Sequence, residues 1–161
     1  MDASIWITIF RLAAVVLLVF ANGFFVAAEF ALVSVRRTRV IELVAQGNSR
    51  ARWVQRAIND PDRFIAATQL GITLASLGLG WIGEPALGVL LRPLIGLFPV
   101  ELEQEVSHSL SAGLAFAIIT FLHVVVGELA PKSIALQSPE RTSLVVAQPT
   151  IWTEAIFKPA I

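Results

Sequence analysis

The sequence predicts an all-α membrane protein that has three transmembrane helices with broken ends and a cytosolic juxtamembrane amphipathic helix. Its 161 residues are 56% hydrophobic and only 15% charged, and the mean hydropathy of +0.75 is too high for an average soluble domain. Several apolar stretches reach the length of about 20 residues that a membrane-spanning helix needs. Basic residues gather in one connection and acidic residues in another, which is typical of loops on opposite sides of a membrane.

Composition also excludes several classes of function. Twelve basic and twelve acidic residues give a formal net charge of zero, so no overall charge favours a nucleic-acid partner. The absence of cysteine excludes thiol catalysis, disulfides, iron–sulfur clusters and Cys-ligated zinc. An intramembrane hydrolase would need a nucleophile and a base such as Ser76 with His123, but nothing in the sequence resembles an activated triad. We therefore expect no enzymatic activity.

The first predicted span is the apolar stretch from Leu12 to Val35, which is too long for the apolar region of a cleaved signal peptide. Glu29 is the one ionisable residue within it. Seven arginines follow between Arg36 and Arg63, and we expect this loop to form two short amphipathic helices, at 40–46 and 50–58. Gly47 would close the first helix, and Asn48 or Ser49 would cap the second. The arginines would face anionic lipid head groups or couple the spans to a cytosolic sensor.

A second apolar stretch, from Phe64 to Val100, is too long for one span. It is interrupted at Gly83-Glu84-Pro85 and again at Arg92-Pro93, so we expect a helix at 64–82 and a shorter apolar segment at 86–98. The next connection carries acidic residues only, namely Glu101, Glu103 and Glu105.

The third predicted span, about Leu110 to Val126, returns the chain to the arginine-loop side, where Lys132 and Arg141 follow. By the positive-inside rule, the arginine loop is cytoplasmic and the N-terminus is outside. The segment from Ser143 to Ile161 is either an interfacial helix or the start of a fourth span. Since Ile161 is not followed by a polar tail, we expect the chain to be a piece of a longer protein.

Three carboxylates within or beside the spans are candidate ion ligands, because an ionisable residue in a membrane is costly and by default marks a site. Glu29 and Glu128 would lie near the cytoplasmic side and Glu84 near the outer side, which suits an ion path with acidic groups at both ends. The alternative is that each carboxylate simply lies at an interface or pairs with an arginine.

The strongest local pattern is the motif Gly127-Glu128-Leu129-Ala130-Pro131. Pro131 removes a backbone donor and disfavours helix at Ala130, so the carbonyls around Gly127 would lose their helical partners. Freed carbonyls beside the Glu128 carboxylate form an oxygen-only ligand set, which suits Mg²⁺, Ca²⁺ or Na⁺. The alternative is a simple proline stop at the membrane face.

Polar side chains of the second span could complete this site. Gln69, Thr73 and Ser76 share one helical face, and Asn22 of the first span could offer an amide oxygen. Their alternative role is hydrogen bonding between helices without an ion. Small residues in the second span, Gly71, Gly78 and Gly80, would let a neighbouring helix come close.

Residues 22–32, 68–78 and 127–132 together resemble the transmembrane domain of the CNNM/CorC family. This resemblance covers almost the whole chain. It implies a homodimer in the plasma (inner) membrane, with a cytosolic CBS-pair module and often a small CorC/HlyC domain following the spans. It also implies Mg²⁺ export, which in some members is driven by inward movement of Na⁺.

Carried over by position, the resemblance implies a cation site that uses oxygens of both helices and of the Gly127 motif. The predicted site residues are Asn22, Glu29, Gln69, Thr73, Ser76, Gly127 and Glu128. Val26 stands where family members with a well-defined Mg²⁺ site commonly have Ser, and the second-span motif has no Asn. These departures favour an alternative function, a membrane sensor or scaffold that carries no ion and regulates another transporter.

Overall fold

The computed structural model describes residues 3–95 and 104–158, and each regular element in these two ranges is helical. The all-α prediction is therefore confirmed. The described part of the chain has three helical segments long and apolar enough to cross a membrane, which are Ile5–Ser34, Pro61–Leu91 and Val106–Gln137. The helices, in chain order, are α1 (Ala3–Ser34), α2 (Arg37–Ala45), α3 (Ser49–Asn59), α4 (Pro61–Ile95), α5 (Gln104–Val124), α6 (Ala130–Gln137) and α7 (Pro139–Phe157), with a π-helical turn at Val125–Leu129 between α5 and α6.

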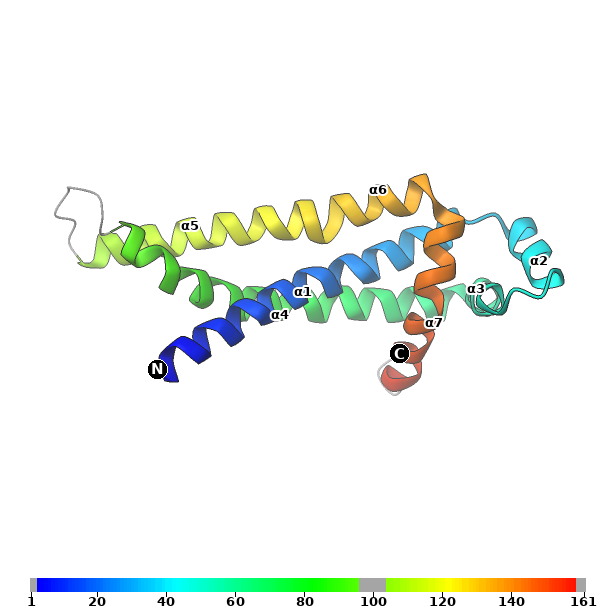
Figure 1. The fold of residues 1–161 in the computed structure, drawn as a ribbon, viewed down its shortest axis with the longest axis horizontal. Coiled ribbons are helices and arrows are strands. Elements are labelled where there is room, and N and C mark those ends of the chain that lie inside the picture. Colours follow the sequence, from blue (N-terminus) through cyan, green and yellow to red (C-terminus); the bar gives the residue numbers. More distant parts are fainter. Residues whose placement is uncertain (1–2, 96–103, 159–161) are drawn as a thin grey trace.

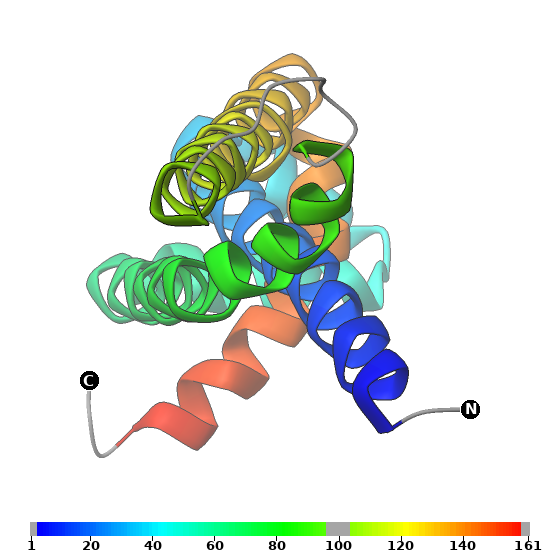
Figure 2. The ribbon, with the colours of Figure 1, turned by 90° about the vertical axis from the view of Figure 1, so that its left-hand side faces the viewer.

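The three spans form an elongated bundle in which α1 packs along α4, and α4 packs against α5 (Figure 1). Helices α2, α3, α6 and α7 gather at one end of the bundle, which we call the arginine end. The N-terminus and the start of α5 lie at the other end, called the opposite end, from which Figure 2 views the spans. Glu29 and Glu128 accordingly lie toward the arginine end and Glu84 toward the opposite end.

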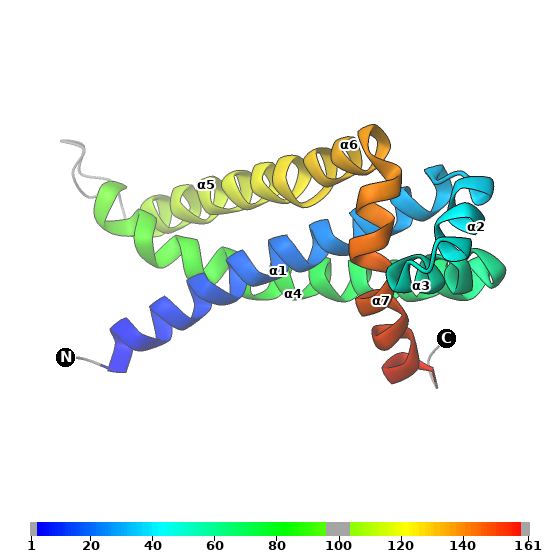
Figure 3. The same cartoon turned by 45° about the vertical axis from the view of Figure 1, so that its right-hand side comes forward.

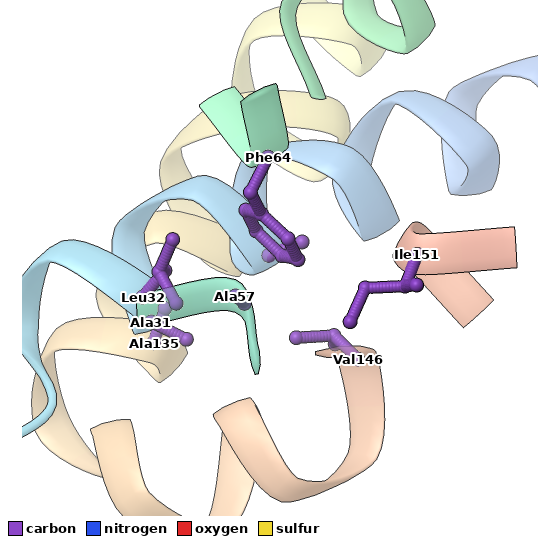
Figure 4. Close-up of a cluster of buried hydrophobic side chains, with 8 residues drawn as sticks. Ala31, Leu32, Ala57, Phe64, Ala135, Val146 and Ile151 are labelled. Carbon is purple, nitrogen blue, oxygen red and sulfur yellow. The ribbon is translucent and has the colours of Figure 1, made fainter. Parts of the chain in front are cut away.

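A cluster of apolar side chains from five helices fills the arginine end (Figure 4). Ala31 of α1 and Ala135 of α6 are fully buried, and their small side chains let these helices approach closely. Phe64 at the start of α4 is only 1% exposed, and burial of such a ring stabilises a protein by about 1.5–3 kcal/mol. The cluster also contains Leu32, Ala57, Val146 and Ile151.

The second apolar stretch is one continuous helix, so the predicted divisions at Gly83-Glu84-Pro85 and at Arg92-Pro93 are wrong. Helix α4 passes through both sites and ends at Ile95. Pro85 removes the donor for the carbonyl of Trp81, but membrane helices accommodate such a loss by bending. Figure 1 shows α4 changing direction in its last third. The rest of the predicted shorter segment, 96–98, and the acidic residues Glu101 and Glu103 lie outside the described residues.

The arginine loop forms the two predicted short helices, α2 and α3. Asn48 caps α3, since its side chain accepts hydrogen bonds from the backbone N–H groups of Arg50 and Ala51 at 3.0 and 3.2 Å. Gly47 has a φ of +86°, a left-handed conformation that lets the chain leave α2 and that other residues rarely adopt. The capping prediction is confirmed on both sides of the turn.

Helix α7 crosses the arginine end rather than continuing along the bundle (Figure 3). It is not among the described segments that are long and apolar enough to span a membrane. Two ion pairs attach it to other helices. Arg39 of α2 lies 3.2 Å from Glu140, and Arg63 of α4 lies 3.3 Å from Glu154.

Candidate cation site

Four polar groups form a hydrogen-bonded chain inside the bundle, which we call the central polar chain. The Asn22 Nδ2 of α1 donates to the Gly127 carbonyl at 2.8 Å. The Ser76 hydroxyl of α4 donates to Asn22 Oδ1 at 3.2 Å, and His123 Nε2 of α5 lies 3.2 Å from the same hydroxyl. Because Asn22 is only 2% exposed, protein groups must satisfy its amide in place of water. The central polar chain therefore links all three spans.

The single proton of the Ser76 hydroxyl fixes the direction of these bonds. If that proton is donated to Asn22 Oδ1, the hydroxyl oxygen can only accept from His123, whose Nε2 must then carry a hydrogen. Each group in the chain consequently donates to the next, from His123 through Ser76 and Asn22 to the carbonyl of Gly127. Aligned bonds of this kind polarise one another in a low-dielectric interior.

Pro131 explains why the Gly127 carbonyl can accept a bond from another helix. In a regular α-helix this carbonyl would accept from the backbone nitrogen of residue 131, and proline has no hydrogen there. The helix does not break at this motif, so the predicted broken end is wrong in this detail. Instead the chain makes a π-helical turn, in which the Ala130 N–H donates to the Val125 carbonyl. Such turns are frequent at functional sites.

Two glycines allow α1 to approach this turn closely. A Cβ atom on Gly23 would lie 2.9 Å from Cγ of Pro131, and one on Gly127 would lie 3.3 Å from Nδ2 of Asn22. The expected close approach in the second span is found at Gly71, where a Cβ would meet the Phe25 ring at 2.5 Å.

A close approach of α1 and α4 is also found at Gly78, where a Cβ would lie 3.3 Å from the Leu18 side chain. The same expectation is wrong for Gly80, which has nothing within 4 Å of a Cβ position. The reason is that Gly80 lines a cavity between α4 and α5.

The predicted residues Glu29 and Gln69 form a separate pair nearer the arginine end. The Gln69 amide of α4 lies close to the Glu29 carboxylate of α1, and Glu29 is half-buried whereas Gln69 is exposed. Thr73 is exposed and donates to the Gln69 carbonyl of its own helix at 2.8 Å. Of the predicted site residues, the structure thus brings Asn22, Ser76 and Gly127 into one chain and leaves Thr73 outside it.

Glu128 is adjacent to the central polar chain in sequence, but its side chain is exposed on the outside of this single chain. It makes no hydrogen bond or ion pair with any residue in the described ranges. The nearby Lys132 has its Nζ 4.4 Å from the centroid of the Phe30 ring of α1, in a cation–π contact. The Glu128 carboxylate is thus left without an ion-pair partner among the described residues.

His123 is the member of the chain that the sequence analysis did not place in the site. It precedes Gly127 by four residues and so lies on the same helical face. That spacing is the signal that could have identified it. The described residues contain no group of three or more His, Asp or Glu side chains close enough to hold a metal ion. The available ligands are therefore mainly neutral oxygens, which suit hard cations.

These features define a class of protein, a three-span α-helical membrane domain with a polar chain across its interior. Residues 12–161 match the family described as the cyclin M transmembrane N-terminal domain, CNNM. The chain belongs to this family. The resemblance seen in the sequence motifs is confirmed.

Bacterial relatives are similar to most of this chain. UPF0053 protein YhdT of Bacillus subtilis is 52% identical over 132 residues, which is 82% of this chain and 28% of the relative. UPF0053 protein YrkA of the same organism is 43% identical over 154 residues, or 96% of this chain and 35% of the relative. An uncharacterized protein of Mycobacterium tuberculosis, Rv1841c, is 42% identical over 145 residues, which is 90% of this chain and 40% of the relative. This chain thus spans about a third of the length of these relatives.

Proposed function

We propose that this domain transports Mg²⁺ across the plasma membrane, in the direction of export. The observation that carries the proposal is the central polar chain, which places carbonyl, amide and hydroxyl oxygens inside an apolar three-span bundle. Polar groups in such a position are expensive and by default mark an ion path. Membership of the CNNM family supports the same function.

The central polar chain can become a cation site through one local change. Rotation of the Asn22 amide would turn Oδ1 toward the Gly127 carbonyl, so that both oxygens and the Ser76 hydroxyl could face one ion. Mg²⁺ prefers about six oxygens and keeps several of its waters, so a few protein ligands are enough. Glu128, one residue after Gly127, would supply the negative charge that these neutral ligands lack.

The Glu29–Gln69 pair is the proposed site of a coupling cation, Na⁺, because it offers a carboxylate and an amide oxygen apart from the central polar chain. Thr73, one turn from Gln69 on the same helix, could add a hydroxyl. Inward movement of Na⁺ would then drive export of Mg²⁺. This part of the proposal is tested by the dependence of Mg²⁺ efflux on a Na⁺ gradient.

We further propose a homodimer oriented with the arginine end in the cytoplasm and the N-terminus outside. Pairing of two chains would cover the exposed Glu128 and remove the cost of leaving it in lipid. The seven arginines of the loop favour this orientation and contact with anionic lipids. In the whole protein, a cytosolic CBS-pair module and a CorC/HlyC domain would follow the membrane domain.

The direct test is Mg²⁺ efflux from loaded proteoliposomes. Glu128→Gln keeps the shape of the side chain but removes its charge, and we expect it to lose most of the flux. Asp62→Asn is the matched control, because Asp62 is exposed at the first turn of α4. Wild-type flux in Glu128→Gln would end the proposal, provided that Asp62→Asn transports normally.

One observation favours the alternative function, a sensor or scaffold that regulates another transporter. Val26, which stands where related Mg²⁺ sites commonly have Ser, is 4% exposed and so places an apolar side chain inside the bundle. Under this alternative the central polar chain only holds the helices together. Purified protein would transport nothing, yet it would change the flux of a separate channel when the two are expressed together.

A further inference from the structure

Two cavities meet at Glu84, in the half of the bundle toward the opposite end. The cavity nearer the central polar chain, called here the deeper cavity, has a volume of about 260 Å³ and lies between α4 and α5, with polar side chains from Ser76, Glu84, Thr120 and His123. The other has a volume of about 240 Å³, with polar side chains from Arg11, Glu84, His108 and Ser111. A single water needs only about 10–15 Å³ of such space. Both cavities can therefore hold several waters.

The deeper cavity leads from Glu84 to the central polar chain. Its lining includes both Ser76 and His123, the two residues through which α4 and α5 join that chain. Ser76 and Glu84 are eight residues apart on one helix, which corresponds to a path of about 12 Å. Gly80, midway between them, is exposed and has nothing within 4 Å of a Cβ position, so no side chain blocks the path there and the cavity also opens to the outside of this chain.

Glu84 is placed to attract a cation into this path. Its side chain is exposed and makes no hydrogen bond or ion pair with another residue in the described ranges. Arg11 lines the outer of the two cavities but not the deeper one, so beyond Glu84 the only other ionisable lining residue is His123. The remaining polar groups there are the hydroxyls of Ser76 and Thr120, which are ligands for hard cations.

We propose that the cavity between α4 and α5 is a water-filled passage for a hydrated divalent cation, with Glu84 at its mouth as the first residue to bind the ion. The passage connects the opposite end of the bundle to the central polar chain. Its role in transport rests on the proposed function. Its access to water and its preference for cations do not depend on the proposed function, and both can be measured without a transport assay.

Cysteine accessibility provides the test, because the sequence has no cysteine of its own. Thr120→Cys and Gly80→Cys would place a thiol in the passage, one on each helix. Phe121→Cys and Leu77→Cys are matched controls on the same helices, since these side chains are 65% and 66% exposed but do not line the passage. Each variant is reconstituted in liposomes and treated with a membrane-impermeant cationic thiol reagent.

We expect Thr120→Cys and Gly80→Cys to react at least about tenfold faster than their controls, from the side opposite to the one that labels Arg52→Cys at the arginine end. Glu84→Gln should slow the cationic reagent several-fold relative to an anionic one, and millimolar Mg²⁺ should slow it when Glu84 is present. Rates equal to those of Phe121→Cys and Leu77→Cys at both positions would overturn the proposal. So would a cation preference that Glu84→Gln leaves unchanged.

Flux measurements separate this inference from the proposed function. If wild-type protein exports Mg²⁺ and Glu84→Gln does so at the same rate, the passage is overturned while the transport function stands. If wild-type protein moves no Mg²⁺ but the labelling pattern holds, the proposed function fails and the passage remains a cation-attracting cavity.

Discussion

The two ends of the bundle differ in what surrounds their side chains. At the arginine end, five helices bury a common apolar cluster around Phe64, and ion pairs from Arg39 and Arg63 attach α7. At the opposite end, large apolar side chains such as Trp6, Phe10 and Trp81 are more than half exposed. Two cavities lie between the helices there. The arginine end thus buries eight clustered residues from five helices, whereas the opposite half buries a smaller cluster, around Val15, Leu79 and Ile119, from three helices.

This difference indicates which part of the molecule can move. Segments with few buried contacts open at low free-energy cost, and moving elements are drawn from such regions. We expect the arginine end to act as a rigid base and the opposite end to open and close around the passage. The central polar chain lies between the end expected to be rigid and the end expected to open and close.

The largest expected effect comes from Phe64→Ala at the arginine end. Removal of a fully buried ring usually costs about 3–5 kcal/mol, and five helices depend on this one. Phe10→Ala, which truncates a ring at the opposite end that is 74% exposed, should change stability by less than about 1 kcal/mol. The free energy of unfolding of both variants can be measured in detergent. Equal losses in the two variants would contradict the difference between the ends.

Asn22→Leu should have the next largest effect, at the boundary between the ends. It removes the donor to the Gly127 carbonyl and the acceptor for Ser76, and each buried group left without a partner costs about 1–3 kcal/mol. Thr73→Val is the control, because that hydroxyl is exposed and bonds only within its own helix. A thermal unfolding scan in which the two variants behave alike would show that the central polar chain contributes nothing to stability.

A smaller difference is expected between two glycines of α4. Gly71→Ala would force a Cβ against the Phe25 ring, and such overpacking costs about 1–3 kcal/mol. Gly80→Ala meets nothing within 4 Å and should stabilise the helix by up to about 1 kcal/mol. Denaturant titrations of both variants give the sign of each effect. Destabilisation by Gly80→Ala would argue against an open cavity at that position.

The smallest effect is predicted for the ion pair between Arg63 and Glu154. Arg63→Gln breaks it, but the arginine side chain is 42% exposed, so the loss should be about 0.5 kcal/mol. The loss should shrink further in high salt. An increase in salt sensitivity on mutation would instead indicate that Arg63 has another role, such as binding lipid.

The sequence predicted features that depend on neighbours along the chain. The apolar lengths of the three spans, the Asn48 cap and the Gly47 turn follow from local patterns. It did not predict how the backbone would respond to Pro85 and Pro131. In both places a helix could end, bend or form a π turn, and the outcome depends on packing against other helices.

The candidate site was predictable in its residue types but not in its grouping. Asn22 and Gly127 are 105 residues apart, and their bond forms where Gly23 lets α1 lie close to Pro131. The helical face shared by Gln69, Thr73 and Ser76 was read from spacing alone. The structure divides these residues, because only Ser76 faces the interior beside Asn22.

If the oxygens gathered around Asn22 bind a hard cation as proposed, calorimetry should detect equilibrium binding of Mg²⁺ to the purified protein. The wild-type protein should bind Mg²⁺, and Ser76→Ala and Glu128→Gln should each weaken binding at least about tenfold, equivalent to 1.4 kcal/mol. Thr73→Val should bind as the wild type does. A wild-type protein that binds no Mg²⁺ at millimolar concentration, or a Glu128→Gln variant that binds it unchanged, would show that these oxygens and Glu128 do not form a Mg²⁺ site.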